Sequence, residues 1–321
     1  MATTTWTASP GGVYRNRFLS DRLLMQAVGA TKLLALTQVP DQDFSSHQGD
    51  TINLMRVSEL TDPTSAKLTE TTRIPIYNLT WGSRAIQLYE WGGGLRVTNF
   101  ARQLGAFHQD NVFQGLLRRQ MERAMDSAVA RDGIFNTDSK LIATPTSATT
   151  LTFDTDGTVT TAAASAMTFD HFGLIADEMA GTYHIPPFVG EDFIFVTARK
   201  NTRALKRDTL WQSIHLYLQK GDLFFKGEVG KAENIRVIEV HRETAISNTS
   251  GTTGLIAEGA FLGDQAIARV EIMTPEVLFD PNFQSDFGRI QAAAWWGILS
   301  FAPFFDVATD GFVRIIKWLS T

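Results

Sequence analysis

The sequence predicts a mixed α+β fold, and three stretches of the chain carry that prediction. Residues 51–90 are rich in Thr, Ile, Val, Leu and Tyr and contain turn residues midway, which is typical of a long β-hairpin. Residues 100–133 repeat apolar side chains at helical spacing. Residues 169–280 alternate short helical patterns with compact apolar runs. A chain of 321 residues is long enough to bury a sizeable core of its own.

The first 50 residues are expected to form an extended arm with one helix in it. Leu19, Leu23 and Ala27 recur at helical spacing, and Pro40 interrupts regular structure after them. The first 40 residues carry four basic side chains against Asp21 alone: Arg15, Arg17, Arg22 and Lys32. Such a short basic arm is solvated, lies along another subunit, or faces nucleic acid.

The hairpin is expected to pair Thr51–Leu60 with Thr71–Tyr89, because Asp62-Pro63 and Ser65 supply turn chemistry between them. Polar residues fall on both of its faces, so its own chain cannot bury a whole face. Since a two-stranded ribbon is marginally stable alone in water, the pattern indicates assembly with a partner surface. The glycines at 92–94 predict a hinge after the hairpin, because no Gly-Lys-Ser/Thr follows as a phosphate-binding loop requires.

The stretch 100–133 predicts one long helix with an apolar side and a mixed-charge outer side. Phe113, Leu117, Met121 and Ala128 follow the i, i+3, i+4 rule, and Gly133 can end the helix. The neighbouring Arg131, Asp132 and Asp138 offer ion pairs that the sequence alone does not assign.

The rest of the chain predicts short helices and buried strands. Asp156-Gly157 is expected at a hairpin tip after Leu151–Phe153, since the third ligand and the Glu of a calcium loop are missing. Helices are predicted over Phe169–Tyr183 and Arg203–Leu218. Strands are predicted over Phe193–Val196, Ile235–Val240, Ala266–Pro275 and Glu276–Phe279, and two more over 289–319, joined at Asp306–Gly311.

Sequence motifs for chemistry are missing. The chain has no cysteine, which excludes disulfides, thiolate metal sites and a cysteine nucleophile. Its six histidines include no i, i+4 pair, and neither a P-loop nor a G-x-S-x-G elbow occurs. We therefore predict no enzyme, cofactor or metal, although a Ser–His–Asp set from remote residues stays open. The most apolar run, Ala292–Phe305, is too short to span a membrane and contains Pro303.

Charge argues against a protein that grips nucleic acid, since 29 basic and 34 acidic side chains leave a net charge of −5. A local exception is a cluster of five basic residues in nine: Arg199, Lys200, Arg203, Lys206 and Arg207. The cluster is a nucleic-acid patch, a solvated helix start, or a subunit contact.

Three short motifs add to this order of elements. They are Phe224–Gly230 followed by Ile235–Glu239, then Gly259–Gly263, and Phe287-Gly288-Arg289 before an apolar strand. Together with the arm, hairpin and long helix, they resemble the major capsid proteins of tailed bacteriophages, particularly those of short-tailed phages. The resemblance implies a Hong Kong 97-like capsid fold. Its parts would be an N-arm (1–50), an E-loop (51–94), a peripheral domain with the spine helix (95–164), an axial domain (165–275) and peripheral return strands (276–321).

The resemblance implies a major capsid protein that self-assembles into hexamers and pentamers. These would form an icosahedral shell around double-stranded DNA, which is bound without sequence specificity. The implied partners are further copies of the chain, a separate scaffolding protein, a portal protein and a candidate decoration protein, with no membrane. The implied location is the virion capsid, assembled in the host cytoplasm. Some relatives form an isopeptide bond; Lys67 sits suitably in the hairpin, but no Asn follows Asn282, so no cross-link is predicted.

The resemblance also places the candidate contact residues. Those expected between subunits are Arg56, Glu59, Asp62, Lys67, Glu70, Arg73, Arg118, Arg119, Glu122 and Arg123. Those expected to face DNA are Arg15, Arg17, Arg22, Arg199, Lys200 and Arg203. Three alternatives stay open: an encapsulin-like nanocompartment shell holding cargo protein, an α/β enzyme with an unrecognised site, and a nucleic-acid-binding module, which the net charge disfavours.

Overall fold

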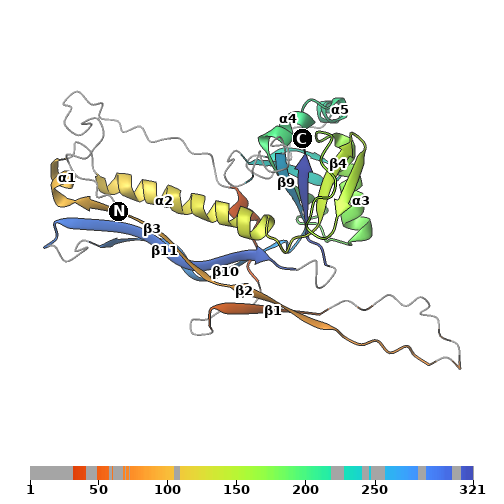
Figure 1. Cartoon of the computed structure of the whole chain (residues 1–321), viewed down its shortest axis with the longest axis horizontal. Coiled ribbons are helices and arrows are strands. Elements are labelled where there is room, and N and C mark those ends of the chain that lie inside the picture. The colour runs from red at the N-terminus through yellow and green to blue at the C-terminus, as the bar shows by residue number, and fades with distance from the viewer. Residues whose placement is uncertain are drawn as a thin grey trace.

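A computed structural model describes most of the chain. The described residues are 32–40, 49–57, 60, 68, 70–71, 73–104, 109–217, 228–240, 246, 257–280, 287–305 and 312–320. The predictions for Arg15, Arg17, Arg22, Glu59, Asp62 and Lys67 lie outside these ranges. Figure 1 shows three parts: an elongated layer of helix on sheet, a compact body around a second sheet, and a projecting two-stranded ribbon.

The elongated layer stacks one long helix on a three-stranded antiparallel sheet. The sheet has the order β10 (Ile267–Asp280), β11 (Ile290–Pro303), β3 (Tyr89–Thr98). The predicted helix is confirmed in two pieces, α1 (Asn99–Leu104) and α2 (Gln109–Ala128), and α2 continues into a π-helical turn, Val129–Ile134. Leu117, Met125 and Ala128 are buried in the same core as Trp295 of β11, as the apolar periodicity requires.

The prediction of a hinge at residues 92–94 is wrong. These glycines lie within β3, paired with β11 in the register Gly93↔Trp295. A Cβ atom on Gly93 would lie 3.0 Å from both Gln120 Oε1 of α2 and Trp295 Nε1. The missing side chain therefore lets the helix and the tryptophan approach the strand closely, which is a packing role rather than a flexible one.

The compact body is built on a seven-stranded mixed sheet. Its order is β5 (Thr150–Asp154), β4 (Ile142–Ser147), β12 (Ile315–Ser320), β9 (Ala257–Leu262), β6 (Phe193–Ala198), β8 (Ile235–Val240), β7 (Glu228–Ala232). Helices α3 (Phe169–Asp177, followed by a π-helical turn, Glu178–Thr182), α4 (Arg199–Leu205) and α5 (Thr209–Tyr217) complete it. Its core is aromatic: the rings of Phe195 and Phe261 stack 4.0 Å apart, and Phe172 and Trp318 pack around them.

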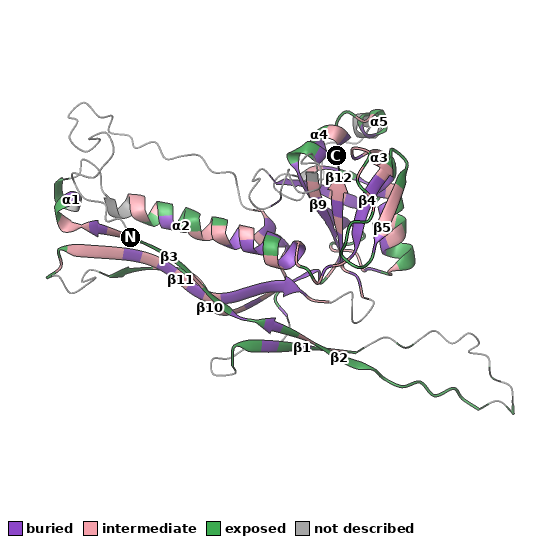
Figure 2. Cartoon of the chain, viewed as in Figure 1, coloured by how far each residue is buried: buried purple, intermediate pink, exposed green. Residues whose placement is uncertain are grey.

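The seven-stranded sheet contains strands from three of the domain ranges that the resemblance implied. Strands β4 and β5 fall in the range 95–164, and β12 falls in 276–321, yet all three belong to the sheet formed mainly by residues 165–275. Figure 2 shows buried strands of this sheet in purple inside the compact body.

Three local predictions are corrected. The β4–β5 turn lies at residues 148–149, and Asp156-Gly157 lies in the bend after β5, where Thr158 N–H donates to Asp156 Oδ1 at 2.8 Å. The helix predicted over Arg203–Leu218 is two helices, because Asp208 accepts from Leu210 N–H at 3.0 Å and starts a new one. The two strands predicted over 266–279 form the single strand β10, with register shifts before Glu276.

The ribbon begins as predicted. Strand β1 (Thr51–Val57) pairs antiparallel with β2 (Trp81–Gln87), from Thr51↔Gln87 to Val57↔Trp81. The second strand was predicted from Thr71, but residues 73–80 form no strand, and Pro75 among them lacks the N–H that a ladder needs. Figure 1 shows this segment running away from the body.

Candidate assembly surfaces

The outer part of the ribbon presents apolar side chains to solvent. Every residue from Arg73 to Trp81 is exposed, and Ile76 keeps 91% of its accessible surface. The green outer ribbon in Figure 2 shows the same exposure. Contiguous exposed apolar surface of this kind marks an interaction site. The predicted contact residues Glu70 and Arg73 lie exposed along it.

The base of the ribbon is anchored on the body. Ile52 and Leu54 of β1 and Ile86 of β2 are buried against Ala268 and Val270 of β10 and Ala302 of β11. The predicted contact residue Arg56 also lies on β1 and is only half-exposed, lining a cavity beside Phe304 and Phe305. The packed base fixes where the ribbon leaves the body, while the outer part stays exposed.

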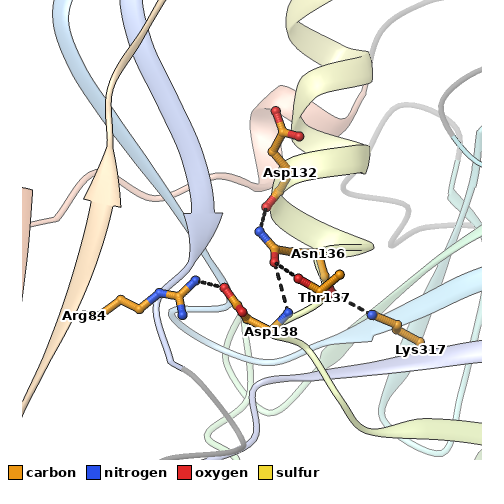
Figure 3. Close-up of polar contacts among 6 residues, drawn as sticks. All are labelled: Arg84, Asp132, Asn136, Thr137, Asp138 and Lys317. Atoms are coloured by element: carbon orange, nitrogen blue, oxygen red, sulfur yellow. Dashed lines mark hydrogen bonds and ion pairs between the residues drawn. The ribbon is translucent and has the colours of Figure 1, made fainter. Parts of the chain in front are cut away.

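A polar junction joins the ribbon, the long helix and the compact body (Figure 3). Arg84 of β2 forms an ion pair with Asp138, just beyond the end of the helix. Asn136 stabilises the backbone at that end of the helix. Its Nδ2 donates to Asp132 O at 2.8 Å, and its Oδ1 accepts from Asp138 N–H at 3.0 Å. The Lys317 Nζ of β12 donates to Asn136 O at 2.6 Å. Three elements thus meet through one short segment.

Burial of Lys317 has an electrostatic consequence. Desolvation lowers the pKa of this amine from 10.5 to about 8, although Asp138 and Glu258 raise it in opposition. The amine donates from β12 to the backbone of the helix end, so this contact positions the body against the elongated layer. The sequence offers no sign of these partners, since Lys317 and Asn136 are 181 positions apart.

The predicted contact residues on the long helix lie together on its outer side. Arg118 Nε lies 3.2 Å from Glu122 Oε1 one turn along the helix; the Arg118 side chain is largely exposed and that of Glu122 is partly exposed. Arg119 and Arg123 are exposed beside them. This set belongs to α2, whereas Arg56, Glu70 and Arg73 belong to the ribbon, so the predicted residues form two separate surfaces.

One acidic residue of α2 has an internal role that sequence reasoning missed. Asp126 is buried, and its Oδ1 accepts from the backbone N–H groups of Leu33 at 2.7 Å and Lys32 at 3.2 Å. The contact anchors the 3₁₀ turn Leu33–Leu36 beside the helix, where the N-terminal segment joins the body. A single Asp among the charged residues of a helix carries no sequence signal for such a distant partner.

The basic cluster is partly compensated by a buried carboxylate. Glu239 of β8 accepts from Thr202 Oγ1 at 2.7 Å, and Arg199 Nε and Lys206 Nζ lie 3.9 and 4.0 Å from it. Lys200 and Arg203 of α4 are exposed. The structure therefore brings the predicted residues Arg199, Lys200 and Arg203 together on one short helix. Of these three, Arg199 lies near the buried carboxylate of Glu239.

Within the described residues, no helix combines the length and apolar character needed to cross a bilayer. In the same part of the chain, no three His, Asp or Glu side chains gather as a metal site would require.

Comparisons with known proteins identify the fold. No family model matches the chain, and no curated protein does. Among solved structures, the capsid of Helicobacter pylori bacteriophage KHP30 matches with a TM-score of 0.68 at 13% identity, over 100% of this chain and 98% of that one. The capsid of Ralstonia phage GP4 matches with a TM-score of 0.68 at 15% identity, over 99% and 98%. The Cyanophage Pam1 capsid matches with 0.68 at 15% identity, over 97% and 98%. The chain has the Hong Kong 97-like fold of these capsid structures, as predicted.

Proposed function

We propose that this chain is a major capsid protein, the shell subunit of a tailed bacteriophage. The observation that carries the proposal is the shared fold over whole chains, including the projecting ribbon, because the matches to phage capsids cover 97% or more of this chain and 98% of each of those three. A single-chain enzyme would have no use for a long exposed apolar ribbon, whereas a shell subunit needs surfaces that only neighbouring copies can cover.

The proposed assembly consists of hexamers and pentamers that close into an icosahedral shell around double-stranded DNA. In it, the ribbon overlaps a neighbouring copy, and the charged outer side of α2 contacts other copies through Arg118, Arg119, Glu122 and Arg123. Since the sequence has no cysteine, no disulfide can link the copies. We therefore expect large obligate interfaces, on the order of 2,000 Å² or more each.

DNA is proposed to meet the shell at the exposed residues of α4 and at the N-terminal arm. Lys200 and Arg203, with Arg199 beside them, would make phosphate contacts that carry no sequence information. Arg15, Arg17 and Arg22 would do the same from the arm. The net charge of −5 suits a protein that encloses DNA without binding it tightly through charge.

The remaining partners follow from the same proposal. A separate scaffolding protein, a portal protein and a candidate decoration protein would act with the shell, which would assemble in the host cytoplasm. The five ranges implied by the resemblance stay a prediction, and we propose counting β4, β5 and β12 with the axial domain because they share its sheet.

Electron microscopy of the purified chain tests the proposal. We expect closed icosahedral particles, and extraction of nucleic acid from particles made during infection should yield double-stranded DNA. Particles filled with cargo protein would favour the encapsulin-like alternative, which none of the solved structures compared above favours. A stable monomer at high protein concentration would contradict both.

A further inference from the structure

A hollow lies at the base of the ribbon, beside the turn between β9 and β10 and the end of β11. It consists of two adjoining cavities of about 240 and 390 Å³, which share Pro40, Gln265 and Phe304. We call it the ribbon-base cavity. An apolar cavity of about 150 Å³ is large enough to take up benzene, so this one has room for a large aliphatic side chain.

The chemistry of the ribbon-base cavity suits an extended peptide. Its walls include Val39, Pro40, Phe304 and Phe305, which offer apolar surface. Gln38 Nε2 donates to Asp264 Oδ1 at 2.7 Å, but the Gln38 Oε1 atom is buried and has no hydrogen-bond partner among the described residues. A buried carbonyl oxygen without a donor is costly, and Gln38 lines the larger cavity. The site therefore suits a ligand that offers an apolar side chain to the walls and an N–H group to Gln38, once the amide turns toward the cavity. An extended backbone with alternating side chains supplies the two together.

The ribbon carries such a segment, residues 73–80. Ile74 and Ile76 point to the same side of an extended chain and keep 72% and 91% of their surface exposed. At about 3.3 Å per residue, the eight residues span roughly 26 Å, and Figure 1 shows them leading away from the ribbon base. The segment therefore lies far from the cavity of its own chain, and a second copy is the source that can supply it.

We propose that the ribbon-base cavity of one copy receives residues 73–80 of a second copy, with Ile76 seated between Val39 and Phe304 and a backbone N–H donating to Gln38 Oε1. The inference rests on the proposed function and adds the receiving site for the ribbon. Charge favours an orientation with Arg73 toward Asp264 of the larger cavity and away from Arg56, which lines the smaller one.

The size of the contact also favours a copy of the same chain as the occupant. One side chain in a cavity buries far less than the roughly 800 Å² per partner of a standard stable interface, so this contact alone holds no pair of proteins together. It joins two different surfaces of one chain, and contacts of that kind repeat around a closed ring. In a hexamer or pentamer, the same weak contact would form once per copy, so the ring as a whole would be stabilised by several such contacts.

The absence of native cysteine allows a clean trapping experiment. A chain carrying both Ile76→Cys and Val39→Cys should, after mild oxidation of assembled shells, give a ladder of linked copies on a non-reducing gel that disappears on reduction. A disulfide needs Cα atoms within about 4.4–6.8 Å, so it forms only where the two positions meet. Each single variant is one control. A second control pairs Ile76→Cys with Val159→Cys, an exposed position in the irregular segment after β5. Both kinds of control should give at least tenfold less of the linked product.

The outcomes separate the inference from the proposed function. Shells of normal shape that give no ladder, or only a link within one chain, would overturn the seating of the ribbon and leave the shell proposal standing. Failure of the unmodified chain to form shells under any condition would overturn the proposed function itself. Independently, Ile76→Asp should lower shell yield at least tenfold, whereas Ile76→Leu should leave it unchanged; equal yields would contradict the inference.

Discussion

His171 is a fully buried histidine, and burial favours the neutral form of its ring. The Thr168 backbone N–H donates to its Nδ1 at 3.1 Å, which assigns the proton to Nε2, and Nε2 lies 2.8 Å from the Ser147 carbonyl oxygen. Burial lowers the pKa of the ring below 6.5, although the Ser147 contact, Asp170 and Asp208 oppose the shift. Protonation would place a second N–H against the Thr168 donor, so the fold binds this proton less readily than the unfolded chain does.

This predicts an acid-sensitive step in stability. Because the unfolded chain binds the proton first, the contribution of His171 is fully present above about pH 6.5 and is lost as the pH falls through the lowered pKa. Urea unfolding of the purified chain at pH 7.5 and 5.5 should show a larger loss for wild type than for His171→Gln. The variant itself should be about 1–2 kcal/mol less stable at pH 7.5, since it loses a buried hydrogen bond of the ring. Identical pH dependence would show that His171 does not titrate on unfolding.

Lys317 gives the same sign as His171, but in the alkaline range. Its folded pKa of about 8 lies below the ordinary 10.5, so between these values the unfolded chain holds the proton that the folded chain has released. The contribution of this residue to stability should therefore rise with pH from about 8 to 10.5. Lys317→Met should flatten that rise, measured as the difference in urea midpoint from wild type at pH 7.5 and 9.5. A difference that stays constant with pH would refute the lowered pKa.

At the scale of elements, two glycines in helical segments should respond oppositely to the same substitution. Alanine is the better helix former at both. A Cβ on Gly173 of α3 meets nothing within 4 Å, so Gly173→Ala should stabilise the chain by about 0.4–1 kcal/mol. A Cβ on Gly133 would lie 2.7 Å from Ile267 Cγ2 of β10, so Gly133→Ala should destabilise it by about 1–3 kcal/mol. Thermal unfolding of both variants checks the pair, and stabilisation by both would mean that the helix end is not tightly packed on β10.

Elements with a strong local pattern were predictable, and their partners were not. The apolar periodicity around Leu117 marked α2, and the apolar run Phe193–Val196 marked a fully buried strand. Gly93 and Gly133 were assigned to a hinge and a helix end, because sequence shows conformational freedom but not the side chain that a missing Cβ admits. The contacts that place the candidate surfaces, Arg84 with Asp138 and Asp126 with Leu33, join residues 54 and 93 positions apart. Such pairings depend on the finished fold, and single charged residues carry no trace of them.

At the scale of the whole molecule, the chain divides into a part that buries its own apolar surface and a part that leaves apolar surface exposed. The two sheets and their helices bury continuous cores, while the outer ribbon presents Ile74, Ile76 and Trp81 to solvent. Without disulfides, a shell of such chains would rest on many repeated contacts of this kind. Stability of the chain and stability of the assembly should therefore respond separately to changes in the ribbon.

Deletion of residues 62–67, which the sequence predicts at the turn between the two ribbon strands, should separate the two. The free energy of unfolding of the unassembled chain should stay within about 0.5 kcal/mol of wild type, because shortening the connection between two strands changes its closure entropy only slightly. Shell yield, or the temperature at which shells dissociate, should fall clearly, since contacts between copies are lost at every repeat. A Gly/Ser replacement of the same six positions is the matched control: it keeps the length and removes the side chains, so equal damage by both variants assigns the effect to side-chain contacts. Calorimetry and electron microscopy of both variants measure the two stabilities, and normal, equally heat-resistant shells from the deletion would show that the ribbon turn plays no part in assembly.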